Sequence, residues 1–140
     1  MKILLPVDGS EYTKRMLSYI GAHEELLGTG HEYVIFTAVE PVPADAARFL
    51  DRRTLDLYYG QQAERVLRPV QRFADQHGWG VRTAHATGQP VRAIVHCAHF
   101  EKADLIVMGT QGHSALASLL LGSVTSGVLA CCSIPVLLVR

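Results

Sequence analysis

The chain has 140 residues, of which 49% are hydrophobic and 19% charged, as in a single globular domain rather than a disordered or fibrous protein. Thirteen basic and thirteen acidic residues cancel, which argues against general attraction to nucleic acid or to an anionic membrane surface. No apolar run approaches the roughly 20 residues of a membrane-spanning helix, and Pro6 and Asp8 interrupt the N-terminal run too early for a signal peptide. These features predict one cytoplasmic domain, residues 1–140.

The first part of the chain contains two strands with a helix between them. Residues 2–8 (KILLPVD) form an apolar run typical of a strand in a buried parallel sheet. Ser10 is a suitable N-cap for the helix that follows, which Gly28 and Gly30 should end. Residues 32–40 are rich in β-branched and aromatic side chains, so they are expected to form the second strand.

A long connection follows, beginning with a proline-rich stretch that merges into a helical pattern ending near His77. Pro69 could kink or interrupt this helix because proline lacks the backbone N–H of an interior helical residue. Residues 80–88 alternate as a third strand, and Pro90 then stands where the first residue of a helix is expected.

The last part of the chain is predicted to contain two further strands, over residues 104–109 and 135–139, with a helix over about 123–132 between them. Strands that alternate with helices build a parallel sheet with right-handed crossovers. The fold class is therefore α/β: a single-domain, doubly wound, five-stranded parallel sheet with helices on both faces.

The stretch GTQGHSALASLLLGS, from Gly109 to Ser123, contains the parts of an anion site. Gly109 and Gly112 let the backbone approach a ligand closely. Gly122 and Ser123 open a helix whose first N–H groups have no partner within the helix. The stretch holds neither Lys nor Arg, so it is not a Walker A motif. A divalent metal could supply the missing positive charge.

Two simpler interpretations stay open at this point. The glycines could merely turn the chain, with Ser123 as an ordinary N-cap. Asp8, at the end of the first strand, could cap the following turn rather than contact a ligand. In an open parallel sheet, however, ligands bind outside the carboxyl ends of the strands, which is where Asp8, Val39 and Met108–Gly109 are expected.

Other potentially reactive side chains favour no specific chemistry. The three cysteines, Cys97, Cys131 and Cys132, form a poor disulfide framework and are expected to be small buried residues in a reducing compartment. His96 and His99 have the spacing of half a metal site, but no second pair is evident. Neither a metal site nor a catalytic residue is therefore predicted.

The whole chain resembles the universal stress proteins. Gly109, Gly112, Gly122 and Ser123 fit the pattern G-x2-G-x9-G-[ST], which is found in the ATP-binding subgroup of that family. The stretches ILLPVDGS, DLIVMGTQGHS and SIPVLLV are similar to the family in the same order. The resemblance implies the strand order 3-2-1-4-5 and a stress-response role in the cytoplasm. It also implies that the protein binds ATP or another adenine nucleotide, and the lack of Lys and Arg in the stretch predicts Mg²⁺ as the accompanying cation.

The resemblance also implies roles for individual residues. Pro6 and Asp8 would border the adenosine, with the Asp8 carboxylate accepting from the base or a ribose hydroxyl. Val39 would meet the adenine edge through its backbone. Met108 and Gly109 would lie along the ribose. The phosphates would be held by Gly112, Gly122, Ser123, Val124 and Thr125. A homodimer would form through the last strand, residues 135–139, an apolar edge that would otherwise favour aggregation.

Three functions remain open. The first is a regulatory module that binds an adenine nucleotide and switches state with it. The second is a weak ATPase or phosphoryl-transfer enzyme, which would need a positioned base and charge stabilisation that the sequence does not reveal. The third is a stress-related interaction module with an empty or different pocket.

Overall fold

A computed structural model gives the fold of the chain and describes residues 1–112 and 121–140. Within these ranges the elements follow one another as β1 (Lys2–Pro6), α1 (Glu11–Ala22), α2 (Glu24–Leu27), β2 (Glu32–Val39), α3 (Ala44–Ala47), α4 (Arg52–Gln76), β3 (Gly80–Thr87), α5 (Pro90–Phe100), β4 (Leu105–Gly109), α6 (Ser123–Cys131) and β5 (Val136–Val139). Every predicted strand is present, with ends that differ from the prediction by one or two residues.

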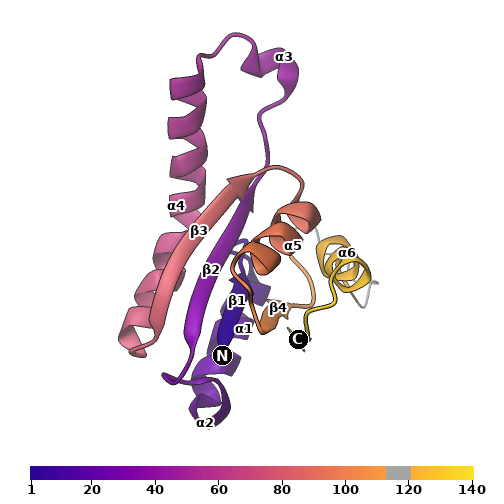
Figure 1. Ribbon diagram of the computed structural model, residues 1–140. Coiled ribbons are helices and arrows are strands. Elements are labelled where there is room, and N and C mark those ends of the chain that lie inside the picture. Colours follow the sequence, from indigo (N-terminus) through magenta and orange to yellow (C-terminus); the bar gives the residue numbers. More distant parts are fainter. Residues whose placement is uncertain (113–120) are drawn as a thin grey trace.

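The strands form one sheet of order β3-β2-β1-β4-β5, and all neighbouring pairs are parallel (Figure 1). The central strand β1 pairs with β2 on one side, where Leu4 lies opposite Val34, and with β4 on the other, where Leu4 lies opposite Ile106. The chain therefore runs outward in both directions from β1, which confirms the predicted doubly wound fold. The reversal of direction beside β1 creates the crevice in which such sheets bind ligands.

Helices cover both faces of the sheet, so its central strands are apolar on both sides. Side chains of α1 and α4, such as Ile20 and Leu67, pack on the face that carries Ile3 and Leu5 of β1. Side chains of α5 and α6 pack on the other face against a group that includes Leu4, Phe36 and Met108. Alternate residues of one strand thus belong to two separate cores, as expected for a buried parallel sheet.

Two helical predictions need correction. The first predicted helix is divided at His23, which leaves helical geometry with φ −122° and ψ 49°. Its ring Nδ1 lies 2.8 Å from the carbonyl oxygen of Tyr19, and α2 starts at the next residue. Pro69, by contrast, does not interrupt α4. Leu67 and Val70 beside it are buried against the sheet, and this packing holds the helix together across the missing hydrogen bond.

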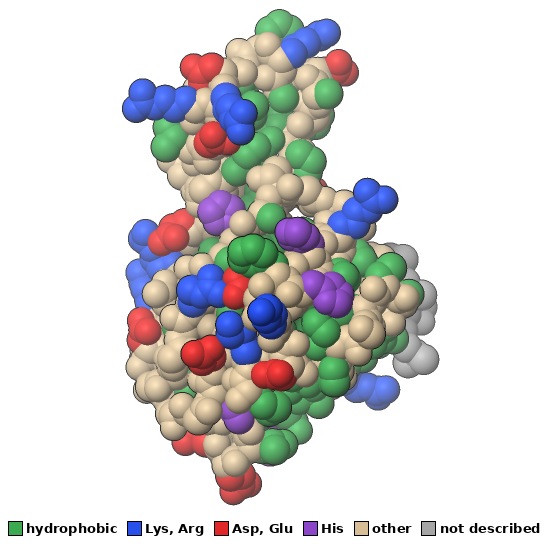
Figure 2. Space-filling view, viewed as in Figure 1, with side chains coloured by type: hydrophobic (Ala, Val, Ile, Leu, Met, Phe, Trp, Pro, Cys, Tyr) green, Lys and Arg blue, Asp and Glu red, His purple; other side chains and the backbone are tan. Residues whose placement is uncertain are grey.

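The N-terminal part of α4 and the short helix α3 project beyond the sheet, as the magenta segments of Figure 1 show. The buried side chains of α4 begin only at Ala63. Hydrophobic and charged side chains share the surface of the projection (Figure 2), and Phe49 is 79% exposed there. Asp51 begins α4 as its N-cap by accepting a 2.7 Å hydrogen bond from the N–H of Thr54.

The cysteines are less buried than their expected role implied. Cys97 is buried in the α5 face of the core, where burial and then the nearby Glu101 carboxylate raise the pKa of its thiol to about 11. Cys131 is exposed and Cys132 is half-buried, because α6 ends there and the chain turns toward β5. In the two described ranges, no helix combines the length and the apolar character needed to cross a membrane.

Candidate functional site

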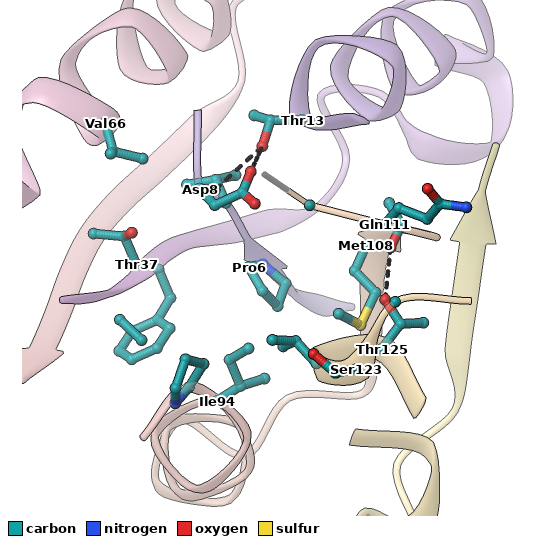
Figure 3. A pocket seen from close by; sticks show the side chains of 18 of the residues that line it. Pro6, Asp8, Thr13, Thr37, Val66, Ile94, Met108, Gln111, Ser123 and Thr125 are labelled. Carbon is teal, nitrogen blue, oxygen red and sulfur yellow. Dashed lines mark hydrogen bonds between the residues drawn. The ribbon is translucent and has the colours of Figure 1, made fainter. Parts of the chain in front are cut away.

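A cavity of about 560 Å³ opens at the carboxyl edge of the sheet, beside the end of β1 (Figure 3). Its size falls within the range of small-molecule and cofactor sites. The ends of β1, β2 and β4 supply its floor, and α4, α5 and the start of α6 supply its walls. The described residues that line it are Pro6, Val7, Asp8, Thr13, Phe36, Thr37, Ala38, Glu40, Val66, Pro90, Ile94, Met108, Gly109, Gln111, Gly112, Gly122, Ser123, Val124 and Thr125.

The sequence-predicted site residues come together around this cavity, with one exception. The predicted residues that line it are Pro6, Asp8, Met108, Gly109, Gly112, Gly122, Ser123, Val124 and Thr125. They come from the end of β1, the end of β4 and the first turn of α6. The first and the last of these segments are more than a hundred residues apart in the sequence. The exception is Val39.

The site position predicted for Val39 is shifted by one residue along β2. Its side chain is buried in the α1–α4 core, and its carbonyl accepts a 3.0 Å hydrogen bond from the N–H of Gly88 on the β3 side. Backbone groups of successive strand residues point to opposite neighbours. Ala38 therefore turns its backbone toward β1, which has already ended, and Ala38 lines the cavity. At the end of β2 it is therefore Ala38, rather than the expected Val39, that lines the cavity.

Asp8 has the capping role that the sequence left as one alternative, and it also lies where the other alternative, contact with a ligand, would require. Its Oδ1 accepts hydrogen bonds from the N–H of Ser10 at 2.9 Å and from the hydroxyl of Thr13 at 3.0 Å. It thus fastens the first turn of α1 at the N-terminus of that helix. Asp8 also lines the cavity, and Figure 3 shows its carboxylate beside Thr13. A capping carboxylate is held in a fixed orientation, which suits it to receive a ligand.

The glycines of the loop after β4 are needed for close packing. A Cβ added at Gly109 would lie 2.7 Å from Cβ of Tyr12, and one added at Gly112 would lie 2.4 Å from Oδ2 of Asp8. Real Cβ atoms essentially never approach other atoms so closely. The hydroxyl of Tyr12 also donates a 3.0 Å hydrogen bond to Oε1 of Gln111. The loop therefore lies directly on the first turn of α1.

The N-terminus of α6 faces the same cavity. Gly122 is its N-cap, with φ −70° and ψ 161°, and Ser123 is the first helical residue, so Ser123 is not the N-cap. The first backbone bond across this turn is from Ser126 N–H to the Gly122 carbonyl, at 2.9 Å. The N–H groups of Ser123, Val124 and Thr125 precede that bond and have no acceptor within the helix. They form the positive end of the helix dipole, which attracts anions in proteins generally.

The hydroxyl of Thr125 bonds within the protein. Its side chain is buried, and its hydroxyl donates a 3.0 Å hydrogen bond to the carbonyl of Gly109. This bond joins α6 to the end of β4 and commits the hydroxyl hydrogen to the protein (Figure 3). Thr125 can therefore offer a ligand its backbone N–H, whereas Ser123 is exposed and keeps its hydroxyl at the surface of the cavity.

The charges of the lining are negative. Asp8 and Glu40 are the charged side chains in it, and the described lining contains no Lys, Arg or His. An anion in this cavity could therefore bind to backbone amides and hydroxyls of the described residues, but not to a cationic side chain among them. No group of three His, Cys, Asp or Glu in the described ranges is arranged to hold a metal ion. His113, a histidine of the stretch from Gly109 to Ser123, lies outside the described residues.

Sequence reasoning missed about half of the lining. Thr13 and Gln111 stand close to recognised motifs and could have been included for that reason. Val66 and Ile94 carry no local signal, because they are ordinary apolar positions on the inner stripes of α4 and α5. Only the packing of those helices brings them to the cavity. The remaining residues not anticipated are Val7, Phe36, Thr37, Ala38, Glu40 and Pro90.

Known proteins resemble this chain over its full length. The model of the "Universal stress protein family" matches residues 1–140. A universal stress protein of Thermus aquaticus is 38% identical over 99% of this chain and 97% of its own length. The structure of MJ0577 of Methanocaldococcus jannaschii has a TM-score of 0.82, with 28% identity, over 99% of this chain and 94% of that one. A universal stress protein in complex with cAMP has a TM-score of 0.67, also with 28% identity, over 100% and 96%.

Proposed function

This chain belongs to the universal stress protein family, and we propose that its cavity binds an adenine nucleotide whose presence regulates the protein. One observation carries the proposal. A glycine loop and the free N–H groups of α6 form one end of a cavity whose other end is apolar, at the switch point of a doubly wound sheet. A phosphate and a flat heterocycle have the matching chemistry. The relative solved with cAMP supports the same ligand class.

The base would lie at the apolar end. Val66 from α4 and Ile94 from α5 border the cavity from two sides (Figure 3), and Phe36 and Pro90 add apolar surface. The backbone N–H and carbonyl of Ala38 are a donor and an acceptor side by side, which is the pair that an adenine edge requires. This assignment replaces the backbone of Val39 by that of Ala38.

The sugar and phosphate would follow from β1 toward α6. The Asp8 carboxylate is suited to accept from a ribose hydroxyl, and Pro6, Met108 and Gly109 line the adjoining part of the cavity. Gly112 and Gly122 leave room for phosphate oxygens against the backbone. The N–H groups of Ser123, Val124 and Thr125 would then hold these oxygens, with the Ser123 hydroxyl.

The charge of the lining limits how many phosphates can bind without a cation. One helix N-terminus is equivalent to about half a positive charge, whereas Asp8 and Glu40 contribute two negative groups. A monophosphate adds about two negative charges, whereas a triphosphate adds about four and so meets the stronger repulsion. Mg²⁺ bound with ATP would offset that charge, and its oxygen ligands would come largely from phosphate and water.

We expect AMP to bind without a metal and ATP to require one. In isothermal titration calorimetry, chelating Mg²⁺ should change the dissociation constant of AMP by less than about threefold and should weaken ATP by about tenfold or more, which corresponds to about 1.4 kcal/mol. Tight ATP binding in the presence of a chelator would contradict the charge argument. The failure of both nucleotides to bind would reject the proposed function.

A binding module accounts for the site better than a rapid enzyme does. Phosphoryl transfer depends on positive groups placed around the transferred phosphate, and the described lining has no Lys or Arg. We also propose a cytoplasmic location, which suits a described chain whose three cysteines are all free thiols. Bound nucleotide would then act by altering the surface that a partner contacts in the stress response.

The strand β5 is the proposed site of dimerisation. It stands at the edge of the sheet, opposite to β3. The Pro135 carbonyl accepts a 2.9 Å hydrogen bond from Ile106 of β4, and the Val139 carbonyl accepts one of 3.0 Å from Thr110, directly after β4. The backbone groups of the odd-numbered residues therefore face the sheet. The backbone groups of Leu138 therefore face outward, on an apolar edge that a second copy of the chain would cover.

Replacing Leu138 with proline should convert the dimer to a monomer, because proline removes the outward N–H while leaving the bonds to β4. Leu138→Val is the matched control, since it trims the partly buried side chain but keeps the N–H. Size-exclusion chromatography with light scattering would measure the mass. A wild-type monomer, or a folded Leu138→Pro variant that remains dimeric, would refute the assignment to β5.

A further inference from the structure

Exposed apolar side chains gather on the projecting arm, residues 44–58, which contains α3 and the first part of α4 (Figure 1). Of the nine large hydrophobic side chains that are exposed in the described chain, four lie on this arm: Phe49, Leu50, Leu57 and Tyr58. Phe49 is 79% exposed and Leu57 is 60% exposed. Single exposed apolar residues need no explanation, but a group of them indicates an interaction surface.

The domain does not use these side chains for its own core. The helix α3 has no buried residue, and the buried residues of α4 begin only at Ala63, after the arm. Transfer of apolar surface out of water is favourable, and Phe49 and Leu57 gain little of it within the described chain. A second surface that covered the arm would supply the missing burial.

The composition of the arm fits a protein as that second surface. The arm combines aromatic side chains with three arginines and contains no Lys, which is the bias found in contacts between proteins. Three aspartates balance the arginines, so the arm has no general attraction to nucleic acid or to anionic lipid. Figure 2 shows charged side chains of both signs beside hydrophobic ones on the arm. The charged residues are Asp45, Arg48, Asp51, Arg52, Arg53 and Asp56.

Four of these six charged side chains have a partner on the arm itself. Asp51 caps α4. Nε of Arg52 lies 4.0 Å from Oδ2 of Asp56. The guanidinium of Arg48 lies over the ring of Phe49, 5.1 Å from its centroid. Two charges of opposite sign therefore remain.

The remaining charges are Asp45 on α3 and Arg53 on α4. Both are exposed, and neither forms an ion pair with another residue of the described chain. In a two-fold contact between identical chains, any pairing of two different residues occurs twice, once in each direction. Asp45 and Arg53 can therefore pair twice between two arms, beside the apolar side chains. The arm is self-complementary in charge and apolar at the same place.

We propose that the arm binds the arm of a second copy of this chain, with Asp45 of each copy paired with Arg53 of the other. The contact needs no nucleotide and is separate from β5, because the arm follows β2 in the other half of the sheet. Four exposed apolar side chains a copy are few beside the roughly 20–30 residues a side of a standard interface. We therefore expect a dissociation constant of about 100 µM, so at about 10 µM the arms are mostly separate and the test of β5 is unaffected.

Analytical ultracentrifugation of the nucleotide-free protein tests the contact. Between about 10 and 500 µM the weight-average mass of the wild type should increase toward double its initial value. Phe49→Ser should keep the initial mass over the whole range, because it removes the most exposed apolar side chain of the arm. Phe100→Ser is the matched control, since Phe100 is 76% exposed on α5, outside the arm. It should associate as the wild type does.

Charge reversal tests whether the partner is a second arm. Arg53→Asp and Asp45→Arg each bring like charges together, so neither variant should associate through the arm on its own. An equimolar mixture of the two variants restores opposite charges at both pairings and should regain the increase in mass. A wild-type mass that stays constant would overturn the proposal and leave the arm to a different protein. So would a mixture that fails to associate, or a Phe100→Ser variant that loses the association as Phe49→Ser does.

Discussion

Replacing Gly122 with valine should weaken AMP binding by roughly 100-fold, the scale of losing one or two charge-assisted hydrogen bonds. Gly122 stands as N-cap where the loop after β4 meets α6. A Cβ at this position would lie 3.2 Å from Cα of Gln111 and 3.5 Å from the carbonyl oxygen of Thr110. The Gly122 N–H also donates a 2.7 Å hydrogen bond to that carbonyl. The branched side chain must therefore push the loop away from the helix N-terminus.

The effect should be confined to the site. Gly60→Ala is the matched control, because a Cβ at Gly60 would meet no atom within 4 Å. Its AMP affinity should equal that of the wild type, and α4 should gain about 0.5–1 kcal/mol from the loss of glycine. Circular dichroism would show whether Gly122→Val keeps its helix and sheet content. A folded Gly122→Val protein with wild-type affinity would contradict the placement of the phosphate.

Replacing Asp8 should separate its two roles. Alanine leaves the N–H of Ser10 and the hydroxyl of Thr13 without the acceptor that Oδ1 supplies, which should cost about 1–3 kcal/mol of unfolding free energy as well as affinity. Asparagine keeps an oxygen at Oδ1, so it should leave stability within about 1 kcal/mol of the wild type. It removes the charge and the second acceptor, and it should still weaken AMP by about tenfold or more.

Removing the Asp8 carboxylate also removes its repulsion of the phosphate, which should strengthen AMP binding. The loss of the hydrogen bond to the ribose is expected to be the larger effect. A hydrogen bond to a charged group contributes about 1.5–3 kcal/mol, and we expect its loss to outweigh the relief of repulsion. Urea unfolding and calorimetry measure the two quantities separately. If Asp8→Asn bound AMP more tightly, repulsion would dominate and the carboxylate would not contact the ribose.

The sequence predicted the fold well because each element carries its own local pattern. Apolar runs such as LIVMG indicate buried strands, and Pro90 marks the start of a helix in the structure as it does in the sequence. The division of the first helix at His23 had no comparable signal. Nor did the continuity of α4 through Pro69, because that depends on the packing of Leu67 and Val70 against a sheet formed by other segments.

The site residues could be predicted where residue type and spacing indicate the chemistry. They could not be predicted where strand pairing determines which backbone groups face the cavity. The glycines, Asp8 and Ser123 were recognised from residue type and spacing, and they line one cavity. The shift from Val39 to Ala38 depends on which neighbouring strand each backbone group faces, and that follows from the ladder rather than from the residue.

The amide chemical shifts of the protein titrated with AMP test the central claim most directly. We expect saturable shifts of the backbone N–H signals of Ser123, Val124 and Thr125 at one end of the cavity and of Ala38 at the other, with one common dissociation constant. The amides of the projecting α3, far from the cavity, should stay unchanged. If AMP leaves these four signals unmoved at concentrations that saturate other changes, the nucleotide binds elsewhere and the proposed site is wrong.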